Sequence, residues 1–197
     1  MMTTARAQDK RERIIRAAQD CFEAEGFHGA SMARIAATAD VSAGLIYRYF
    51  ASKEAIIEAI VQRQLEAIQA HVDCGPRDAT SLAQRLTAEY GEPVGYNPRR
   101  GNPKLGLELS AESTRNPAIG AVVRRFDTEI RRHITQWLAA PVADGGRAMP
   151  PTKARERALM LQIVIEGLMV REAREPDLDR ALLGRTLARL IPEVLDA

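Results

Sequence analysis

The chain has 197 residues, of which 46% are hydrophobic and 27% are charged, and its formal net charge is +2. This length can bury a substantial core, in one large or two small domains, and the composition is typical of a soluble globular protein. The small net charge excludes a protein that binds polyanions over its whole surface. Two cysteines, Cys21 and Cys74, give neither a disulfide framework nor a metal-binding spacing, and we expect Cys21 to be a small core residue.

The N-terminus, M-M-T-T-A-R-A-Q-D-K, lacks the apolar segment of a signal peptide, and no run of residues approaches the length of a membrane span. We therefore expect a cytoplasmic protein with no membrane partner. Residues 1–8 are expected to be disordered. The first helix is predicted from about Asp9 to Glu25, ended by Gly26. Its apolar side consists of Ile14, Ile15, Ala18, Cys21 and Phe22.

The stretch from Ser31 to Phe50 predicts two short helices joined by a tight turn. Ser31 and Ser42 are suited to cap the two helices, because their hydroxyls accept bonds from free backbone N–H groups. Asp40 and Val41 form the turn between them. The inward positions, at helical spacing, are Ile35, Ala36, Ala39, Ile46 and Phe50. This pattern predicts a helix-turn-helix, whose second helix enters the major groove of DNA.

The outward face of the second helix has side chains suited to DNA. Ala43 and Gly44 let the backbone approach a phosphate or a base edge, and Arg48 can bind phosphate or guanine. The alternative is that these residues are ordinary packing and solvated groups. Residues 1–60 carry eight basic and eight acidic residues, so DNA binding must depend on a local patch. The candidate DNA-binding residues are Ser31, Arg34, Ser42, Ala43, Gly44, Tyr47, Arg48, Tyr49 and Lys53.

Residues 10–60 resemble the DNA-binding domain of the TetR family of bacterial one-component regulators. The resemblance rests on an ordered set of residues: Ile14, Ala18, Phe22, Gly26-Phe27, Ser31, Ile35-Ala36, Val41-Ser42, Gly44, Tyr47, Phe50 and Ser52-Lys53-Glu54. Two positions depart from the family pattern. Asp40 stands where glycine is usual, and Ala43 stands where lysine is frequent, which removes a possible phosphate contact.

We therefore predict an all-α chain of about nine helices in three parts. Residues 9–52 form the DNA-binding domain, with the helix-turn-helix at about 32–51. Residues 53–73 form a linking helix, capped by Ser52 and about 30 Å long. Residues 74–197 form a ligand-binding and dimerisation domain. Its helices are predicted at about 80–90, 105–114, 117–140, 152–174 (capped by Thr152) and 178–195, with a loop at 91–104 and a linker at 141–151.

The segment from Ala158 to Val170 is apolar on nearly all sides, so we expect a second subunit to cover part of it. The last helix has an apolar stripe of its own, and the family resemblance also implies a homodimer. Such a dimer would place two recognition helices about 34–36 Å apart, or a multiple of that, on a palindromic operator. The candidate interface residues are Leu161, Ile165, Gly167, Leu168, Leu183, Leu187, Leu190 and Ile191.

Apolar and aromatic side chains in the C-terminal part suit a small apolar or amphipathic effector. The candidate residues are Tyr90, Tyr96, Leu109, Phe126, Trp137 and Met160, although core packing would explain most of them equally well. Four arginines form two rows on one predicted helix: Arg124, Arg125, Arg131 and Arg132. They fit an acidic effector or DNA, but the better interpretation is a solvated face with the pairs Asp127–Arg131 and Arg125–Glu129.

The sequence offers no catalytic constellation, so we expect no enzyme, no cofactor and no metal site. The histidines His28, His71 and His133 are scattered and lack partners at motif spacing, and we find no glycine-rich phosphate loop. We therefore predict a ligand-responsive, sequence-specific DNA-binding regulator, a repressor that an effector releases from its operator. The alternative is a helical sensor or interaction protein whose N-terminal domain no longer binds DNA specifically.

Overall fold

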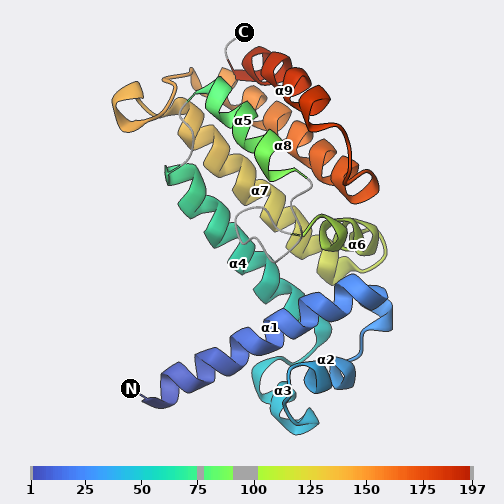
Figure 1. Cartoon of the computed structure of the whole chain (residues 1–197). Coiled ribbons are helices and arrows are strands. Elements are labelled where there is room, and N and C mark those ends of the chain that lie inside the picture. The colour runs from blue at the N-terminus through green and yellow to red at the C-terminus, as the bar shows by residue number, and fades with distance from the viewer. Residues whose placement is uncertain (1, 75–77, 91–101, 196–197) are drawn as a thin grey trace. The chain divides into compact units, whose positions relative to one another are not determined.

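The computed structural model describes residues 2–74, 78–90 and 102–195, and within these ranges the chain is all-helical (Figure 1). This confirms the predicted fold class. No helix in these ranges is both long and apolar enough to span a membrane. The elements are α1 (Met2–Gly29), α2 (Met32–Thr38), α3 (Ala43–Tyr49), α4 (Lys53–Cys74), α5 (Ala79–Glu89), α6 (Pro103–Ser113), α7 (Pro117–Ala139), the 3₁₀ segment η1 (Val142–Asp144), α8 (Pro151–Arg174) and α9 (Arg180–Leu195).

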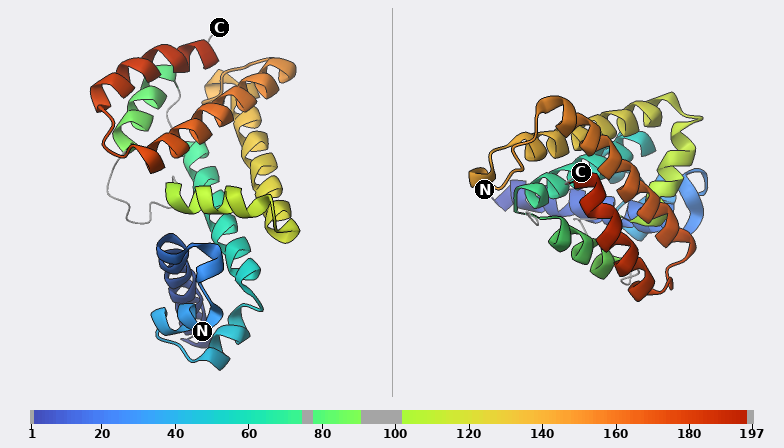
Figure 2. Two further views of the ribbon diagram at one scale, coloured as in Figure 1. Left: turned by 90° about the vertical axis from the view of Figure 1, so that its right-hand side faces the viewer. Right: turned by 90° about the horizontal axis from the view of Figure 1, so that it is seen from above.

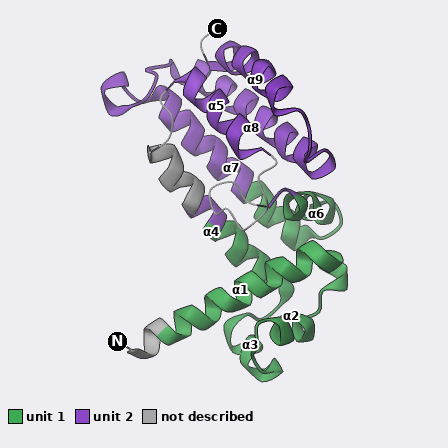
Figure 3. Ribbon diagram, in the orientation of Figure 1, with its two compact units in different colours: residues 1–63, 104–125 green, residues 64–103, 126–197 purple. Residues whose placement is uncertain are grey.

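The chain divides into two compact units (Figure 3). Unit 1 comprises residues 1–63 and 104–125, and unit 2 comprises residues 64–103 and 126–197. Helices α4 and α7 both begin in unit 1 and continue in unit 2. The sequence analysis places residues 104–125 in the C-terminal domain, whereas in the structure they pack with the N-terminal helices.

Helix α1 is longer than the sequence analysis predicts. It begins at Met2, so the expectation of disorder is wrong for residues 2–8, and residue 1 lies outside the described residues. The physical reason is that no glycine or proline precedes Gly26, so nothing ends a helix earlier. Gly26 interrupts the helical geometry with φ of 70°, as expected of a glycine at a helix end, and one further turn follows it.

The core of unit 1 is formed by the apolar sides of α1, α2, α3 and the start of α4. All inward positions predicted for the first three helices are buried, which confirms that part of the analysis. Cys21 is among them, and its Sγ donates to Thr38 Oγ1 at 3.4 Å. The largest fully buried side chains of unit 1 are Phe22, Ile14, Ile15, Ile35, Ile46, Ile56, Ile57, Ile60 and, from the start of α7, Ile119.

In unit 2, α5 and α9 lie side by side, as two views show (Figures 1 and 2). The core between them and α7 and α8 contains Leu82, Ile134, Leu138, Leu161, Leu183, Leu187 and Ile191. Helix α5 starts earlier than predicted because Asp78 caps it by accepting from Ser81 N–H at 2.8 Å.

The starts of α6 and α8 also differ from prediction. Helix α8 starts at Pro151, with Pro150 in the N-cap position, so the predicted cap at Thr152 is wrong. Proline suits this first position because its missing N–H has no helical acceptor there. Most of the predicted loop at 91–104 lies outside the described residues, but Pro103 and Lys104 belong to α6.

Candidate nucleic-acid interface

Two seven-residue helices, α2 and α3, form the helix-turn-helix of unit 1 (Figure 1). Each is capped as predicted: Ser31 Oγ accepts from Arg34 N–H at 3.1 Å, and Ser42 Oγ accepts from Leu45 N–H at 3.2 Å. Ile35 and Ile46 are fully buried. Helices this short are not stable by themselves, so the caps and the two buried isoleucines hold them on the unit 1 core.

The turn between α2 and α3 is held from α1. Asp40 has φ of 51°, in the left-handed region where glycine is usual. The guanidinium of Arg13 donates to the carbonyl of Ala39 at 2.7 Å and lies 3.3 Å from the Asp40 carboxylate. Arg13 thus satisfies a carbonyl at the end of α2 and pairs with the residue that departs from the family pattern. The sequence analysis did not identify this role, because nothing in the local pattern pairs these two segments.

The N-terminal end and outer face of α3 are open to solvent. Ser42, Ala43, Gly44 and Arg48 are exposed, and the Tyr47 side chain is 58% exposed. A Cβ added at Gly44 would meet nothing within 4 Å, so this end of the helix is free of obstruction. Hydroxyl, guanidinium and backbone N–H donors therefore share one accessible surface, which is what binding to phosphates and base edges requires.

Three other predicted DNA-binding residues, Arg34, Lys53 and Tyr49, are bonded within the chain or half-buried. Arg34 is exposed on α2, but its Nε donates to Glu25 Oε1 at 2.9 Å, and this bond with the Glu25 charge raises the pKa of Arg34. Lys53 is half-buried, with its Nζ 2.7 Å from the Phe27 carbonyl and 4.5 Å from the centre of the Phe27 ring. Tyr49 is half-buried. Lys53 therefore joins α4 to the end of α1, whatever contact it makes with DNA.

One cation beside α3 was missed by the sequence analysis. The guanidinium of Arg11 lies 5.2 Å from the centre of the Phe50 ring, next to the C-terminal end of α3. This places a positive charge from α1 beside the C-terminal end of α3, although residues 1–60 are neutral as a whole. No sequence signal marks Arg11, because its place depends on how α1 packs.

The candidate dimer residues fall into two groups. Leu161, Leu183, Leu187 and Ile191 are buried in the core of unit 2 within a single chain. Of the others, Ile165 and Leu168 are half-buried, and Gly167 and Leu190 are exposed. The exposed large apolar residues on α8 and α9 are Leu159, Met160, Ile163, Leu182 and Leu190. This set, here called the apolar α8–α9 face, includes one of the predicted residues, Leu190.

The candidate effector residues are divided between the two units. Leu109 belongs to unit 1, while Tyr90, Phe126, Trp137 and Met160 belong to unit 2, and Tyr96 lies outside the described residues. Tyr90 is buried, with its hydroxyl donating to the Glu175 carbonyl at 3.0 Å, and burial raises its pKa. Trp137 Nε1 donates to the Gly145 carbonyl at 3.1 Å, and Met160 is exposed. Tyr90 and Trp137 thus have structural partners within unit 2.

The arginines of α7 bind groups of their own chain. Arg125 lies 2.6 Å from Glu58 rather than paired with Glu129. Arg131 donates to Gln162 at 3.0 Å, and Arg132 lies 2.8 Å from Glu129. These contacts favour the interpretation of a structural, solvated face over a site for an acidic effector.

Two family models match the chain. The model described as "Bacterial regulatory proteins, tetR family" matches residues 14–60, which cover the helix-turn-helix. The model described as "BetI-type transcriptional repressor, C-terminal" matches residues 96–196. Together they cover most of the chain, including both helices of the apolar α8–α9 face.

Individual relatives agree with these models. The chain is 28% identical over 192 residues to the HTH-type transcriptional regulator UidR of Escherichia coli K12, covering 92% of this chain and 94% of UidR. It is 30% identical over 168 residues to the HTH-type transcriptional regulator BetI of Cronobacter sakazakii, covering 83% of this chain and 79% of BetI. Among solved structures, GusR of Salmonella enterica has a TM-score of 0.73 at 26% identity, with 96% of both chains covered. The chain belongs to the TetR family of bacterial helix-turn-helix transcriptional regulators.

Proposed function

We propose that this TetR-family regulator acts in the cytoplasm as a homodimeric repressor, which binds an inverted-repeat operator and is released by a small effector. The observation that carries the proposal is the open outer face of α3, where Tyr47 and Arg48 are exposed on a helix that Ser42 caps and the buried Ile46 anchors. A repressor is supported by the match of residues 96–196 to a transcriptional repressor model.

The apolar α8–α9 face supports a second copy of the chain as the partner. Ile163 is 58% exposed and Leu182 is 48% exposed, and both lie on helices whose other sides are already packed in unit 2. Fully burying an exposed side chain of this kind is worth about 1.5–3 kcal/mol, and these side chains are already about half-buried, so each gains roughly half of that. A symmetric contact gains from every residue twice. Two subunits joined there would present two α3 helices to one duplex.

Release by an effector requires that the ligand binds the DNA-free state more tightly. A coupling of about 1–3 kcal/mol would change operator affinity about 5–150-fold. The effector is proposed to be small and apolar or amphipathic and to bind in the C-terminal domain. The arginines of α7 have contacts of their own, so an acidic effector held by that face is less well supported.

The test is a selection of random DNA duplexes by the purified protein near physiological salt. An enriched inverted repeat, with half-sites one or more helical turns apart, is the expected result. If no sequence is enriched, the selection is repeated after unfolding and refolding to remove a co-purified ligand. A second failure would overturn the proposal and favour a helical sensor or interaction protein.

A further inference from the structure

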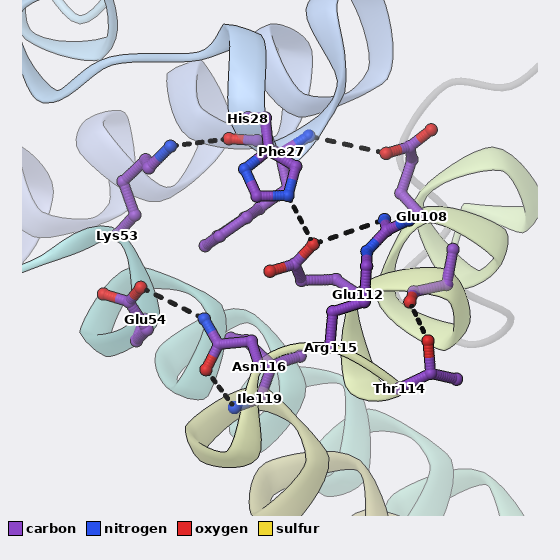
Figure 4. A network of polar contacts seen from close by, with 11 residues as sticks. Phe27, His28, Lys53, Glu54, Glu108, Glu112, Thr114, Arg115, Asn116 and Ile119 are labelled. Carbon is purple, nitrogen blue, oxygen red and sulfur yellow. Dashed lines mark hydrogen bonds and ion pairs between the residues drawn. The ribbon is translucent and has the colours of Figure 1, made fainter.

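Helix α6 places one row of charged side chains against the end of α1, and both helices lie in unit 1. Figure 4 shows two members of the row, Glu108 and Glu112. Lys104 Nζ is 4.0 Å from Glu23, Glu108 Oε2 is 3.4 Å from the backbone nitrogen of Phe27, and Glu112 Oε2 is 2.8 Å from His28 Nε2. The three α6 residues are spaced by four, so they share one face of the helix. This row meets α1 at the point where Gly26 interrupts it.

Phe27 is held from two helices at once. Its N–H donates to the Glu108 carboxylate of α6, and its carbonyl accepts from Lys53 at the start of α4 (Figure 4). Its ring is buried, 5.6 Å from the ring of Phe22. The backbone just after the Gly26 kink therefore has its N–H, its carbonyl and its side chain all engaged.

The Glu112 carboxylate is unusual in its burial. Its side chain is 4% exposed, yet its partners His28 and Arg115 are 73% and 64% exposed. Arg115 is a permanent cation beside Glu112, and the imidazole of His28 is a second one when it is protonated. Losing either neighbour reduces the compensation of a charge in a low-dielectric site. Arg115 lies at 3.5 Å and only three positions from Glu112 in the sequence, so this pair does not reach α1. His28 is therefore the partner that connects Glu112 to α1.

We propose that Glu108 and Glu112 are positioning residues for operator binding, although they lie outside the helix-turn-helix. Only Gly29, Ala30 and Ser31 separate His28 from the start of α2, so a contact that fixes His28 fixes the entry to α2 and, through it, α3. The carboxylates hold the kinked end of α1 against α6 and thereby set the direction in which the recognition helix is presented within unit 1. This inference rests on the proposed function, since its consequence is measured on DNA.

The test is a double-mutant cycle on operator affinity, with the full-length chain and the selected duplex. The variants are His28→Gln, Glu112→Gln and the pair together. We expect each single variant to weaken specific binding about five- to tenfold and the double variant to be no weaker than the worse single one, because both remove the same contact. Additive losses, or no loss, would overturn the proposal.

A control is needed because Glu112→Gln also removes one negative charge, which strengthens nonspecific DNA binding. Glu129→Gln makes the same change in charge on α7 in unit 2, where Glu129 pairs with Arg132. This variant is expected to bind the operator as the wild type does. The exchanged pair His28→Glu with Glu112→His again places a carboxylate opposite an imidazole. We expect it to recover at least half of the lost operator affinity. Failure to recover would count against a specific contact.

A second measurement separates this inference from the proposed function. Hydrogen exchange of the free protein should show faster exchange from Phe27 through α2 in Glu112→Gln, with α8 and the total helix content by circular dichroism unchanged. If the wild type selects no operator, the proposed function fails, and the exchange data alone decide the positioning role. Unchanged exchange between Phe27 and Thr38 would overturn it.

Discussion

The helix-turn-helix and the apolar α8–α9 face expose opposite kinds of side chain. On α3 the exposed residues are small or hydrogen-bonding: Ser42, Ala43, Gly44, Tyr47 and Arg48. On α8 and α9 the exposed residues include five large apolar ones, Leu159, Met160, Ile163, Leu182 and Leu190, beside exposed charged residues such as Glu156 and Arg174. The other sides of these helices are buried in the cores of their units. The two regions therefore differ in the kind of partner that their exposed surfaces can bind. The first suits a hydrated polyanion, and the second suits a surface like itself.

The helices that carry the two surfaces are also held in place by different contacts. Helices α2 and α3 have seven residues each and depend on caps, on the Arg13 contact and on two buried isoleucines. Helices α8 and α9 have 24 and 16 residues and are held by a continuous apolar core. A contact far from α3 can therefore alter how it is presented, whereas α8 should tolerate single losses.

The largest effect is expected from a charge on the apolar α8–α9 face. Ile163→Asp should weaken dimerisation on the order of a thousandfold, because losing a hot spot costs about 2 kcal/mol and a symmetric interface contains it twice. Light scattering after size-exclusion chromatography measures this as a shift from dimer to monomer. Val142→Asp is the matched control, since Val142 is 70% exposed but lies on η1. Equal dimerisation of the two variants would remove this face from the interface.

The next effect concerns the polar surface. Arg48→Ala should weaken specific operator binding about ten- to a hundredfold, through one lost base or phosphate contact in each subunit. Tyr47→Phe, which removes a single hydroxyl, should cost less. Fluorescence anisotropy with the selected duplex measures both. Arg174→Ala, an exposed arginine at the end of α8, makes the same charge change and should bind as the wild type does. Comparable losses in Arg48→Ala and Arg174→Ala would mean that only net charge matters.

A smaller effect tests the support of the helix-turn-helix. Arg13→Ala removes the donor to the Ala39 carbonyl and the partner of Asp40, and it should lower the free energy of unfolding by about 1 kcal/mol. Urea denaturation measures the difference. Arg16→Ala, an exposed arginine on the same helix, should have little effect. If both variants unfold at the same urea concentration, the turn does not depend on α1.

The sequence predicted those parts of the fold that local pattern determines. Ser31 and Ser42 cap helices, and Ile35 and Ile46 face inward, because each role depends on neighbours three or four positions away. The candidate DNA residues on α3, apart from the half-buried Tyr49, are exposed for the same reason. Helix ends next to proline were less predictable: α8 begins at Pro151 without the expected Thr152 cap.

The remainder depends on contacts that no local pattern contains. Helical spacing marks Leu161 and Leu187 as apolar, but it cannot tell a core within one chain from an interface between two. Glu108 and the Phe27 amide are 81 positions apart, and nothing near either one indicates the other. The grouping of residues 104–125 with the N-terminal helices follows from such contacts, so it appears only in the structure.

The smallest effect concerns an acidic group in unit 2. Burial raises the pKa of Asp127, the Glu166 charge raises it further, and Arg131 opposes the shift. A carboxyl whose pKa is higher in the folded state binds its proton more readily there. It therefore destabilises the fold as pH rises through the folded pKa, and this cost is absent below the unfolded pKa.

Asp127→Asn should accordingly raise the free energy of unfolding at pH 7, by no more than about 0.5 kcal/mol because the group is only partly buried. The gain should disappear as the pH falls toward the ordinary range of a carboxyl. Urea denaturation at several pH values measures both quantities. Glu156→Gln, at an exposed position on α8, provides the control for charge. A gain that stays constant with pH would show that the variant improves packing in unit 2 rather than relieving the cost of a buried charge.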